Sequence, residues 1–293
     1  MPAKPDQRGT NTWAGTAQPY SKSFAHLCAG AIAPLLDEVE DVIGALAGKQ
    51  LADVGCGTGT LAGIATGRGA RVTAVDPDAG MLSLAGAEAP EAALCVGAVP
   101  NLPFEPGRFD AVVANFVVNH VGDPRAAVAD LMRVCSPSGV VGVTVWPSKP
   151  SAINALWAAV VNASGAVTLP PQHLAAEMDF ERTQRGLAGL LIEAGLNRVQ
   201  ATTVSWEFRI DPDDLWAGPA GGVAGIGKIV SSQTPATQSL MRRAYERLVS
   251  PMIRSGQVVL PAVALLATGR APGTDHDPYE TRPAARPAAS EIS

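Results

Sequence analysis

Between residues 50 and 146, short apolar runs alternate with segments of helical character. The apolar runs predict strands at 50–54, 71–76, 92–97, 109–115 and 139–146. Helices are predicted between them at 59–69, 78–89 and 123–135. Short strands that alternate with helices form βαβ units, so this order predicts an α/β fold with a parallel sheet covered by helices on both faces.

The second half of the chain is less regular. A helix is predicted at 179–196, followed by an alternating strand at 199–210. The last strand is predicted at 257–269, where Pro261 indicates a sheet edge or a bulge because proline has no N–H for a neighbouring strand.

We expect one main domain over 16–270, with a flexible start at 1–15 and a disordered tail at 271–293 that has little to bury. Within it, some segments do not fit the alternation and are predicted to form a partly helical cap beside the sheet. These cap segments are 16–44, 147–178 and 211–255. The first of them includes a predicted amphipathic helix at 21–39.

The composition excludes several classes of protein. Charged residues are 17% of the 293 residues, the net charge is −5, and no basic block is present, which argues against a nucleic-acid partner. The four cysteines lie far apart and form no C-x-x-C pair, so no metal site is expected. No apolar run is long enough to span a bilayer, and the polar first residues lack the apolar core of a secretion signal. We therefore expect a soluble, cytoplasmic protein without a membrane partner.

The stretch ADVGCGTGTLAG, residues 52–63, places three glycines after the first predicted strand. Glycines at such a turn let a ligand approach the backbone. The dinucleotide pattern G-x-G-x-x-G/A requires a small residue where Thr60 stands, and the P-loop pattern requires a lysine that is missing. A nucleoside triphosphate is therefore disfavoured as the ligand. NAD is less favoured but not excluded.

Two acidic residues flank this loop. Asp53 precedes it and would repel a pyrophosphate, whereas it suits a positively charged ammonium group. Asp76 ends the second strand about 20 residues beyond the first glycine, where an acid accepts hydrogen bonds from ribose hydroxyls. A ligand with an ammonium group, a ribose and no phosphate is S-adenosylmethionine.

The motifs also resemble a known family. LADVGCGTGTLA is similar to motif I of class I S-adenosylmethionine-dependent methyltransferases, and VTAVDPDAGML to the next motif. VGAVPNLPFEPGRFDAVVANFVVNHVGDP and SPSGVVGVTVW resemble later motifs of the ubiquinone/menaquinone-biosynthesis-like branch, methyltransferase type 11. The resemblance covers about residues 45–146. It implies a Rossmann-like, seven-stranded, mostly parallel sheet with an antiparallel last strand, and S-adenosylhomocysteine as a product.

The cofactor contacts follow from the loop, from the strand ends and from the resemblance. Asp76 would bind the ribose and Met81 would lie beside the adenine. The branch commonly has an acid where this chain has Ala98, so the adenine would rest on backbone groups around 97–99. The full predicted set is Tyr20, Asp53, Gly55, Cys56, Gly57, Gly59, Asp76, Pro77, Met81, Gly97, Ala98, Val99, Asn115 and Phe116.

Three residues are candidates for the chemistry. His120 follows the fourth strand at the edge of the sheet where ligands bind, and an imidazole titrates near neutrality. His173 lies in the first long insertion and Tyr20 in the N-terminal segment that often closes over the cofactor in the resembling branch. Each also has a structural interpretation, as a packed histidine or a surface-turn tyrosine.

We expect methyl transfer by in-line displacement to a small, rather hydrophobic acceptor, driven mainly by positioning. The acceptor atom is oxygen, nitrogen or carbon, on a molecule such as a terpenoid, indole or polyketide, and the composition resembles that of bacterial natural-product enzymes. A homo-oligomer formed through the N-terminal helix or the cap is an open alternative to a monomer. The rival functions are an NAD-dependent Rossmann oxidoreductase and a non-catalytic nucleoside-binding module.

Overall fold

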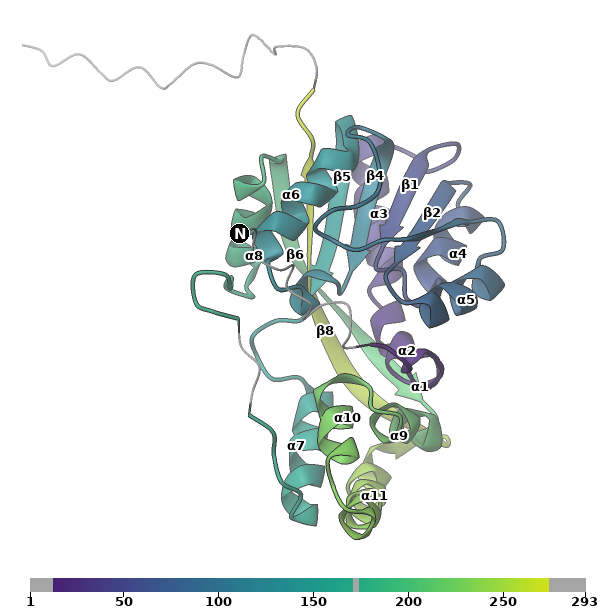
Figure 1. Ribbon diagram of the computed structural model, residues 1–293, viewed down its shortest axis with the longest axis vertical. Helices are drawn as coiled ribbons and strands as arrows, with labels where there is room; N and C mark the ends of the chain where they lie inside the picture. Colours follow the sequence, from purple (N-terminus) through teal and green to yellow (C-terminus); the bar gives the residue numbers. More distant parts are fainter. Residues whose placement is uncertain (1–12, 171–173, 274–293) are drawn as a thin grey trace, which may run out of the picture.

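The computed structural model describes residues 13–170 and 174–273. Its centre is a sheet in the order β3-β2-β1-β4-β5-β8-β6, with β1 to β5 parallel and β8 antiparallel to both β5 and β6 (Figure 1). The expected seven-stranded sheet with an antiparallel last strand is therefore confirmed, and a two-residue strand pairs with β8 in addition. The strands are β1 Gln50–Val54, β2 Arg71–Asp76, β3 Ala93–Val96, β4 Phe109–Asn115, β5 Cys135–Val145, β6 Asn197–Ile210, β7 Ile253–Arg254 and β8 Gln257–Arg270.

Helices cover both faces of the sheet. One buried cluster joins it to α6 and α8, and a second joins it to α3, α4 and α5 (Figure 1). Both faces of β1, β2, β4 and β5 are thus largely kept from water, as their apolar sequences require, whereas β3 at the sheet edge is mostly exposed. The helices are α1 Ala17–Lys22, α2 Phe24–Ala29, α3 Ile32–Ile43, α4 Thr60–Gly67, α5 Ala79–Glu88, α6 Pro124–Val134, α7 Ala152–Ser164, α8 Gln184–Glu193, α9 Pro212–Ala220, α10 Ala224–Ser231 and α11 Pro235–Val249, with short 3-10 turns η1 Val118–His120 and η2 Ser250–Met252.

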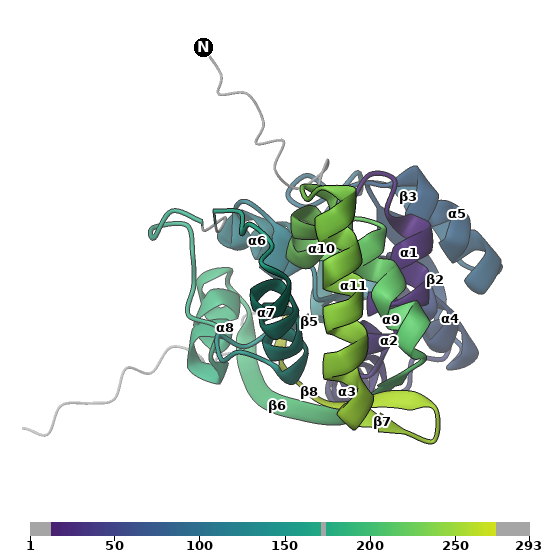
Figure 2. The ribbon, with the colours of Figure 1, turned by 90° about the horizontal axis from the view of Figure 1, so that it is seen from below.

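The cap is built on two strands that run past the rest of the sheet. β5 pairs with β8 only as far as Val145 and Leu265, whereas β6 and β8 remain paired to Ile210 and Val258. Helices α7, α9, α10 and α11 pack on this extension through a third buried cluster, and α1 and α2 lie between the cap and the sheet (Figures 1 and 2). Pro261 lies in the extension, where β8 has β6 on one side but not β5, so the predicted edge position is confirmed.

Two predicted helices differ from the structure. The helix expected over 21–39 is divided into α1, α2 and α3, with breaks at Ser23 and at the Gly30–Ala31 turn. A Cβ atom at Gly30 would collide with the indole of Trp206, so the turn brings the backbone directly onto that ring. The helix expected from 179 starts only at Gln184, because the Thr183 side chain caps it by accepting a hydrogen bond from the Gly186 N–H.

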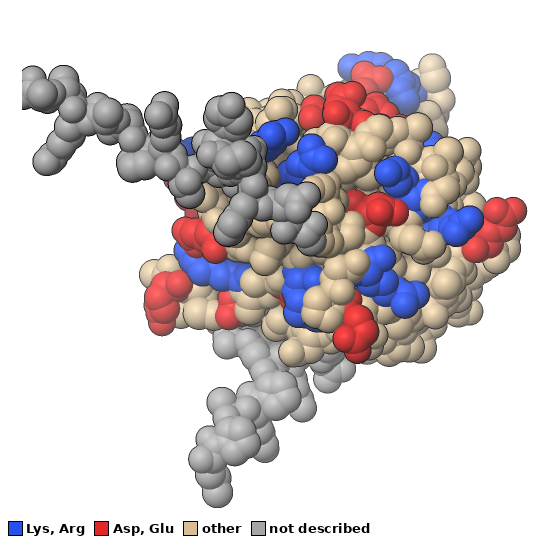
Figure 3. Space-filling view, turned by 90° about the horizontal axis from the view of Figure 1, so that it is seen from above, with Lys and Arg blue, Asp and Glu red and all other residues tan. Residues whose placement is uncertain are grey.

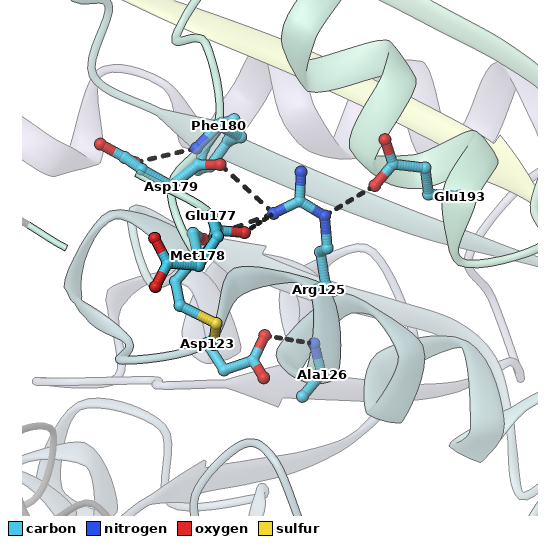
Figure 4. Close-up of polar contacts among 8 residues, drawn as sticks. All are labelled: Asp123, Arg125, Ala126, Glu177, Met178, Asp179, Phe180 and Glu193. Atoms are coloured by element: carbon cyan, nitrogen blue, oxygen red, sulfur yellow. Dashed lines mark hydrogen bonds and ion pairs between the residues drawn. The ribbon is translucent and has the colours of Figure 1, made fainter. Parts of the chain in front are cut away.

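Arg125 fixes the segment that precedes α8 (Figure 4). Its Nη1 donates to the carbonyls of Glu177, Met178 and Asp179 at 3.4, 3.5 and 3.2 Å, and its Nε pairs with Glu193 at 2.9 Å. One guanidinium thus binds the segment to α6 and α8 together, which uses the forked donor geometry of arginine.

The end of the molecule opposite the cap carries acidic and basic side chains interspersed over its surface (Figure 3). Within the described ranges, no helix combines the length and the apolar character needed to cross a membrane.

Candidate active site

The glycine loop connects β1 to α4 at the carboxyl end of the sheet. Gly55, Gly57 and Gly59 have φ values of 68°, 53° and 86°, a region that side chains disfavour. A Cβ at Gly59 would also lie 2.7 Å from the Ala85 Cα. The loop is held to β2 because the N–H groups of Gly55 and Cys56 both donate to the Val75 carbonyl, at 2.7 and 2.9 Å.

Two buried carboxyl groups flank the loop. Asp76 accepts hydrogen bonds from the N–H groups of Gly57 at 3.0 Å and Asp78 at 2.9 Å, whereas Asp53 Oδ2 has no partner among the described residues. Burial and the charge of Asp76 raise the pKa of Asp53 to about 7, and burial raises the pKa of Asp76 as well. An unpartnered acid beside a second acid favours a ligand that brings a positive, hydrogen-bonding group.

The N-terminal segment lies over this loop, and we call residues 13–29 the lid. Tyr20 of α1 reaches Gly57, where a Cβ would lie 3.6 Å from the ring. The Trp13 ring meets Tyr20 edge-on at 5.7 Å and His120 edge-on at 5.3 Å, so it spans from the glycine loop side to the end of β4. Burial raises the pKa of Tyr20, and it raises the pKa of Cys28 to about 12, so both groups stay neutral near pH 7.

A cavity of about 40 Å³ remains between the lid and the loop. It has room for only a few water molecules, so the lid lies close against the loop. The cavity is lined by Tyr20, Ala25, Cys28, Ala29, Ile32, Asp53, Gly55, Cys56, Gly57, Thr58, Thr60, Leu61 and Asn115.

The residues predicted around the adenine lie on the same edge of the sheet. Met81 is buried in α5, and its N–H donates to Asp78 at 2.9 Å. Gly97 follows β3 and donates to the Asp76 carbonyl at 3.3 Å, so the turn that contains Ala98 and Val99 runs beside Asp76. Pro77 sits between Asp76 and Asp78 in the sequence.

Asn115 and Phe116 occupy the end of β4. Asn115 donates to the Cys28 carbonyl at 3.1 Å and accepts from Thr144 Oγ1 at 2.6 Å, so it ties the lid to the sheet. Phe116 has a φ of 58°, which is uncommon for a bulky residue, and its N–H donates to the Thr144 carbonyl and hydroxyl. Its ring stacks on Trp146 with centroids 3.8 Å apart.

The candidates for proton transfer are not all brought together. His120 lies exposed in η1, where its ring meets that of Trp13 edge-on. Tyr20 and His120 each meet the ring of Trp13 edge-on and, among the described residues, are linked only through it. His173 lies outside the described residues.

A "Methyltransferase domain" family model matches residues 52–143. A demethylmenaquinone methyltransferase of Beutenbergia cavernae is 30% identical over 164 residues, which cover 53% of this chain and 68% of that protein. The chain belongs to the class I S-adenosylmethionine-dependent methyltransferases. The same enzyme of Renibacterium salmoninarum is 36% identical to this methyltransferase over 101 residues, 34% of the chain and 43% of that protein, so this match spans less than half of the relative.

The fold agrees with this assignment. A solved structure from Thermotoga maritima, described as a methyltransferase and possible histamine N-methyltransferase, aligns over 89% of this chain and 99% of its own, with a TM-score of 0.51 and 14% identity. Among the described residues of the methyltransferase, no group of three or more His, Cys, Asp or Glu is placed to hold a metal ion.

The sequence left several residues of this region unnoticed. Trp146 is the last residue of the strand predicted at 139–146, which ends at the ligand-binding edge, and that position was a usable signal. Cys28, Val117 and Trp206 carry no such signal. Cys28 reaches the site through a tertiary contact of α2, and Trp206 through the far strand β6.

Proposed function

We propose that this methyltransferase transfers a methyl group from S-adenosylmethionine to a small, rather hydrophobic acceptor and releases S-adenosylhomocysteine. The observation that supports this most directly is the buried Asp53 Oδ2 without a partner beside the glycine loop. Leaving a buried carboxylate oxygen unpaired costs free energy, and the ammonium group of the methionine moiety would satisfy it.

The second acid fits the other half of the same ligand. Asp76 already accepts two backbone hydrogen bonds, and a carboxylate has about four acceptor sites. It would therefore accept hydrogen bonds from the ribose hydroxyls and keep those from the Gly57 and Asp78 N–H groups. Two buried acids would repel the pyrophosphate of NAD, which disfavours the oxidoreductase alternative.

Bound S-adenosylmethionine supplies an electrophilic methyl group on a sulfonium. The protein's part is to orient and to exclude water: the glycine loop, Asp53 and Asp76 position the donor, and the lid covers it. Tyr20 is a neutral phenol here and serves as a hydrogen-bond donor. His120 would serve as the base for an acceptor that reaches η1.

The apolar cap supports a hydrophobic acceptor. The third buried cluster joins the lid to α7, α9, α10 and α11, and it consists of aliphatic and aromatic side chains. We propose a natural-product acceptor of terpenoid, indole or polyketide type, methylated at oxygen, nitrogen or carbon, and no nucleic-acid or membrane partner. Association into a homo-oligomer through the lid or the cap stays a prediction.

Calorimetry with S-adenosylhomocysteine and with NAD tests the donor. We expect binding of S-adenosylhomocysteine and none of NAD. Asp76→Ala should weaken S-adenosylhomocysteine binding at least tenfold, about 1.4 kcal/mol. Asp110→Asn, at the opposite end of β4, should leave the affinity unchanged because the amide still accepts from the Gln50 N–H. Binding of NAD alone would refute the proposal, and an unaffected Asp76→Ala would refute the ribose assignment.

Transfer of a labelled methyl group to a panel of phenols, quinones, indoles and terpenoids tests for catalysis. Methylation of at least one apolar compound, in preference to charged ones, is expected. Tight binding of S-adenosylhomocysteine with no transfer to any compound would favour the non-catalytic nucleoside-binding module.

A further inference from the structure

One polar side chain interrupts the apolar run at the end of β5. Residues 140–145 read VVGVTV, and Thr144 is the only one of them with a polar side chain. It is fully buried in the sheet, where β5 has β4 on one side and β8 on the other. A buried hydroxyl group costs free energy unless it is hydrogen-bonded, so a threonine among valines at this position requires an explanation.

Thr144 links two consecutive residues at the end of β4. Its Oγ1 accepts a hydrogen bond from the Phe116 N–H at 2.9 Å and donates its own proton to Asn115 Oδ1 at 2.6 Å. These directions are fixed, because a backbone N–H only donates and a hydroxyl has a single proton. Phe116 brings its N–H to this place with a φ of 58°, which a bulky residue adopts only where its surroundings hold it.

The Thr144 hydroxyl fixes the orientation of the Asn115 amide. With Oδ1 on the hydroxyl, Nδ2 faces the lid and donates to the Cys28 carbonyl at 3.1 Å. This carbonyl lies in the last turn of α2, where helix carbonyls need partners from outside the helix. A flipped amide would set its oxygen against the Cys28 carbonyl, and two acceptors repel each other. The orientation of this amide therefore decides whether the end of β4 attracts the lid or repels it.

We propose that Thr144 is a positioning residue, which keeps the lid on the glycine loop by holding the Asn115 amide in its present orientation. Asn115 and Cys28 both line the cavity between lid and loop, so the contact lies at the donor site itself. The hydrogen bonds from the Phe116 N–H through Thr144 and Asn115 to the lid act as one unit, because each donor meets an acceptor. The inference rests on the proposed function for the ligand that the lid covers.

Thiol labelling of the full chain without ligand tests the hold on the lid. Burial raises the pKa of Cys28 to about 12, so N-ethylmaleimide should react slowly with it until the lid moves away. Labelling at pH 8 is resolved by mass spectrometry, with Cys95 of the edge strand β3 as the internal reference. Thr144→Val removes the hydroxyl, keeps the shape and leaves the Phe116 N–H bonded to the carbonyl of residue 144. It should speed labelling of Cys28 at least fivefold and that of Cys95 less than twofold.

Further variants separate positioning from packing. Thr144→Ser keeps the hydroxyl, and its Cys28 rate should stay within twofold of the wild type. Asn115→Ala should speed labelling of Cys28 as Thr144→Val does, and adding Thr144→Val to it should change the rate less than twofold further. Thr268→Val makes the same change at a buried threonine of the neighbouring strand β8 and should leave the Cys28 rate within twofold of the wild type.

An unchanged Cys28 rate in Thr144→Val would overturn the inference. An equal rise in Thr144→Ser, or additive effects of Thr144→Val and Asn115→Ala, would also overturn it, because Thr144 would then act through packing. If Thr144→Val does not fold, Thr144→Ala is compared with Thr144→Ser, which differs from it only by the hydroxyl, and equal Cys28 rates would overturn the inference. Calorimetry with S-adenosylhomocysteine accompanies every variant, so failure of the donor assignment is seen separately from the labelling result.

Discussion

Asp53 is a carboxyl group whose surroundings oppose its charge. It is 1% exposed, one of its oxygens has no partner in the described chain, and its pKa is raised to about 7 by burial and by Asp76. Between about pH 4 and pH 7 the folded protein therefore holds a proton that the unfolded chain has released. The stability of the ligand-free protein should accordingly fall as the pH rises through this window.

Asp53→Asn removes this dependence of stability on pH, because the amide does not titrate. From pH 5 to pH 8 the wild-type protein should lose up to about 3 kcal/mol of unfolding free energy relative to the variant. Urea unfolding at both pH values, without ligand, measures the difference. Asp37→Asn, at an exposed acid, is the control and should follow the wild type. Parallel pH profiles for Asp53→Asn and the wild type would contradict the assigned pKa.

At the residue scale, the sequence predicted what depends on local backbone chemistry. The glycine turn and the acid that ends β2 follow from spacing alone, and the structure has them at one edge of the sheet. Trp206 and Cys28 were not predictable, because each reaches the site by a contact between elements far apart in the chain.

Among the elements, α9 and the lid pack unusually closely. A Cβ at Gly218 would collide with the Ser23 hydroxyl and lie 2.8 Å from the Phe24 ring, and one at Gly221 would collide with Pro19. The glycine-rich stretch of the cap therefore permits direct contact between helix backbones. These two glycines are therefore packing positions.

Gly218→Ala should separate the lid from α9 and speed the dissociation of S-adenosylhomocysteine by about tenfold, which corresponds to about 1.4 kcal/mol. Gly225→Ala in α10 is the matched control, because its Cβ meets nothing within 4 Å, and it should change the rate less than twofold. Stopped-flow displacement measures both rates. If S-adenosylhomocysteine dissociates from Gly218→Ala as slowly as from the wild type, the contact between Gly218 and the lid does not keep the lid in place.

Element prediction worked where local pattern and tertiary packing agree. The strands β1, β2, β4 and β5 and the helices beside them were predicted because each apolar run is buried by its own neighbours in sequence, and β3 was predicted although it is mostly exposed. The N-terminal helix was predicted as one piece, since its amphipathic pattern continues through Ser23 and Gly30, whereas contacts with α9 and β6 divide it. The helices of the cap were expected only in outline.

On the scale of the whole molecule, the lid lies over the glycine loop and leaves a cavity of about 40 Å³ between them. We therefore predict that S-adenosylhomocysteine binds after the lid moves away from the loop. The observed binding rate of S-adenosylhomocysteine should therefore reach a plateau as its concentration rises. Trp13→Ala removes the edge contacts with Tyr20 and His120 and should raise the plateau severalfold. Stopped-flow fluorescence measures this rate, and a linear dependence up to high concentration would contradict a closing lid.

The pairing of Ile210 with Val258 places the two ends of the 211–255 insertion side by side on adjacent strands. The insertion leaves the sheet at the end of β6 and returns to it at the start of β8, beside the same point. It is therefore replaceable as a unit, because a different insertion would change neither the pairing of β6 with β8 nor the distance that the insertion has to bridge. The donor half of the site, by contrast, is encoded almost continuously from β1 to the end of β4, and only the lid and Ile32 of α3 lie outside that stretch. The architecture is therefore modular: grafted caps of other lengths offer a route to new acceptors on an unaltered donor site.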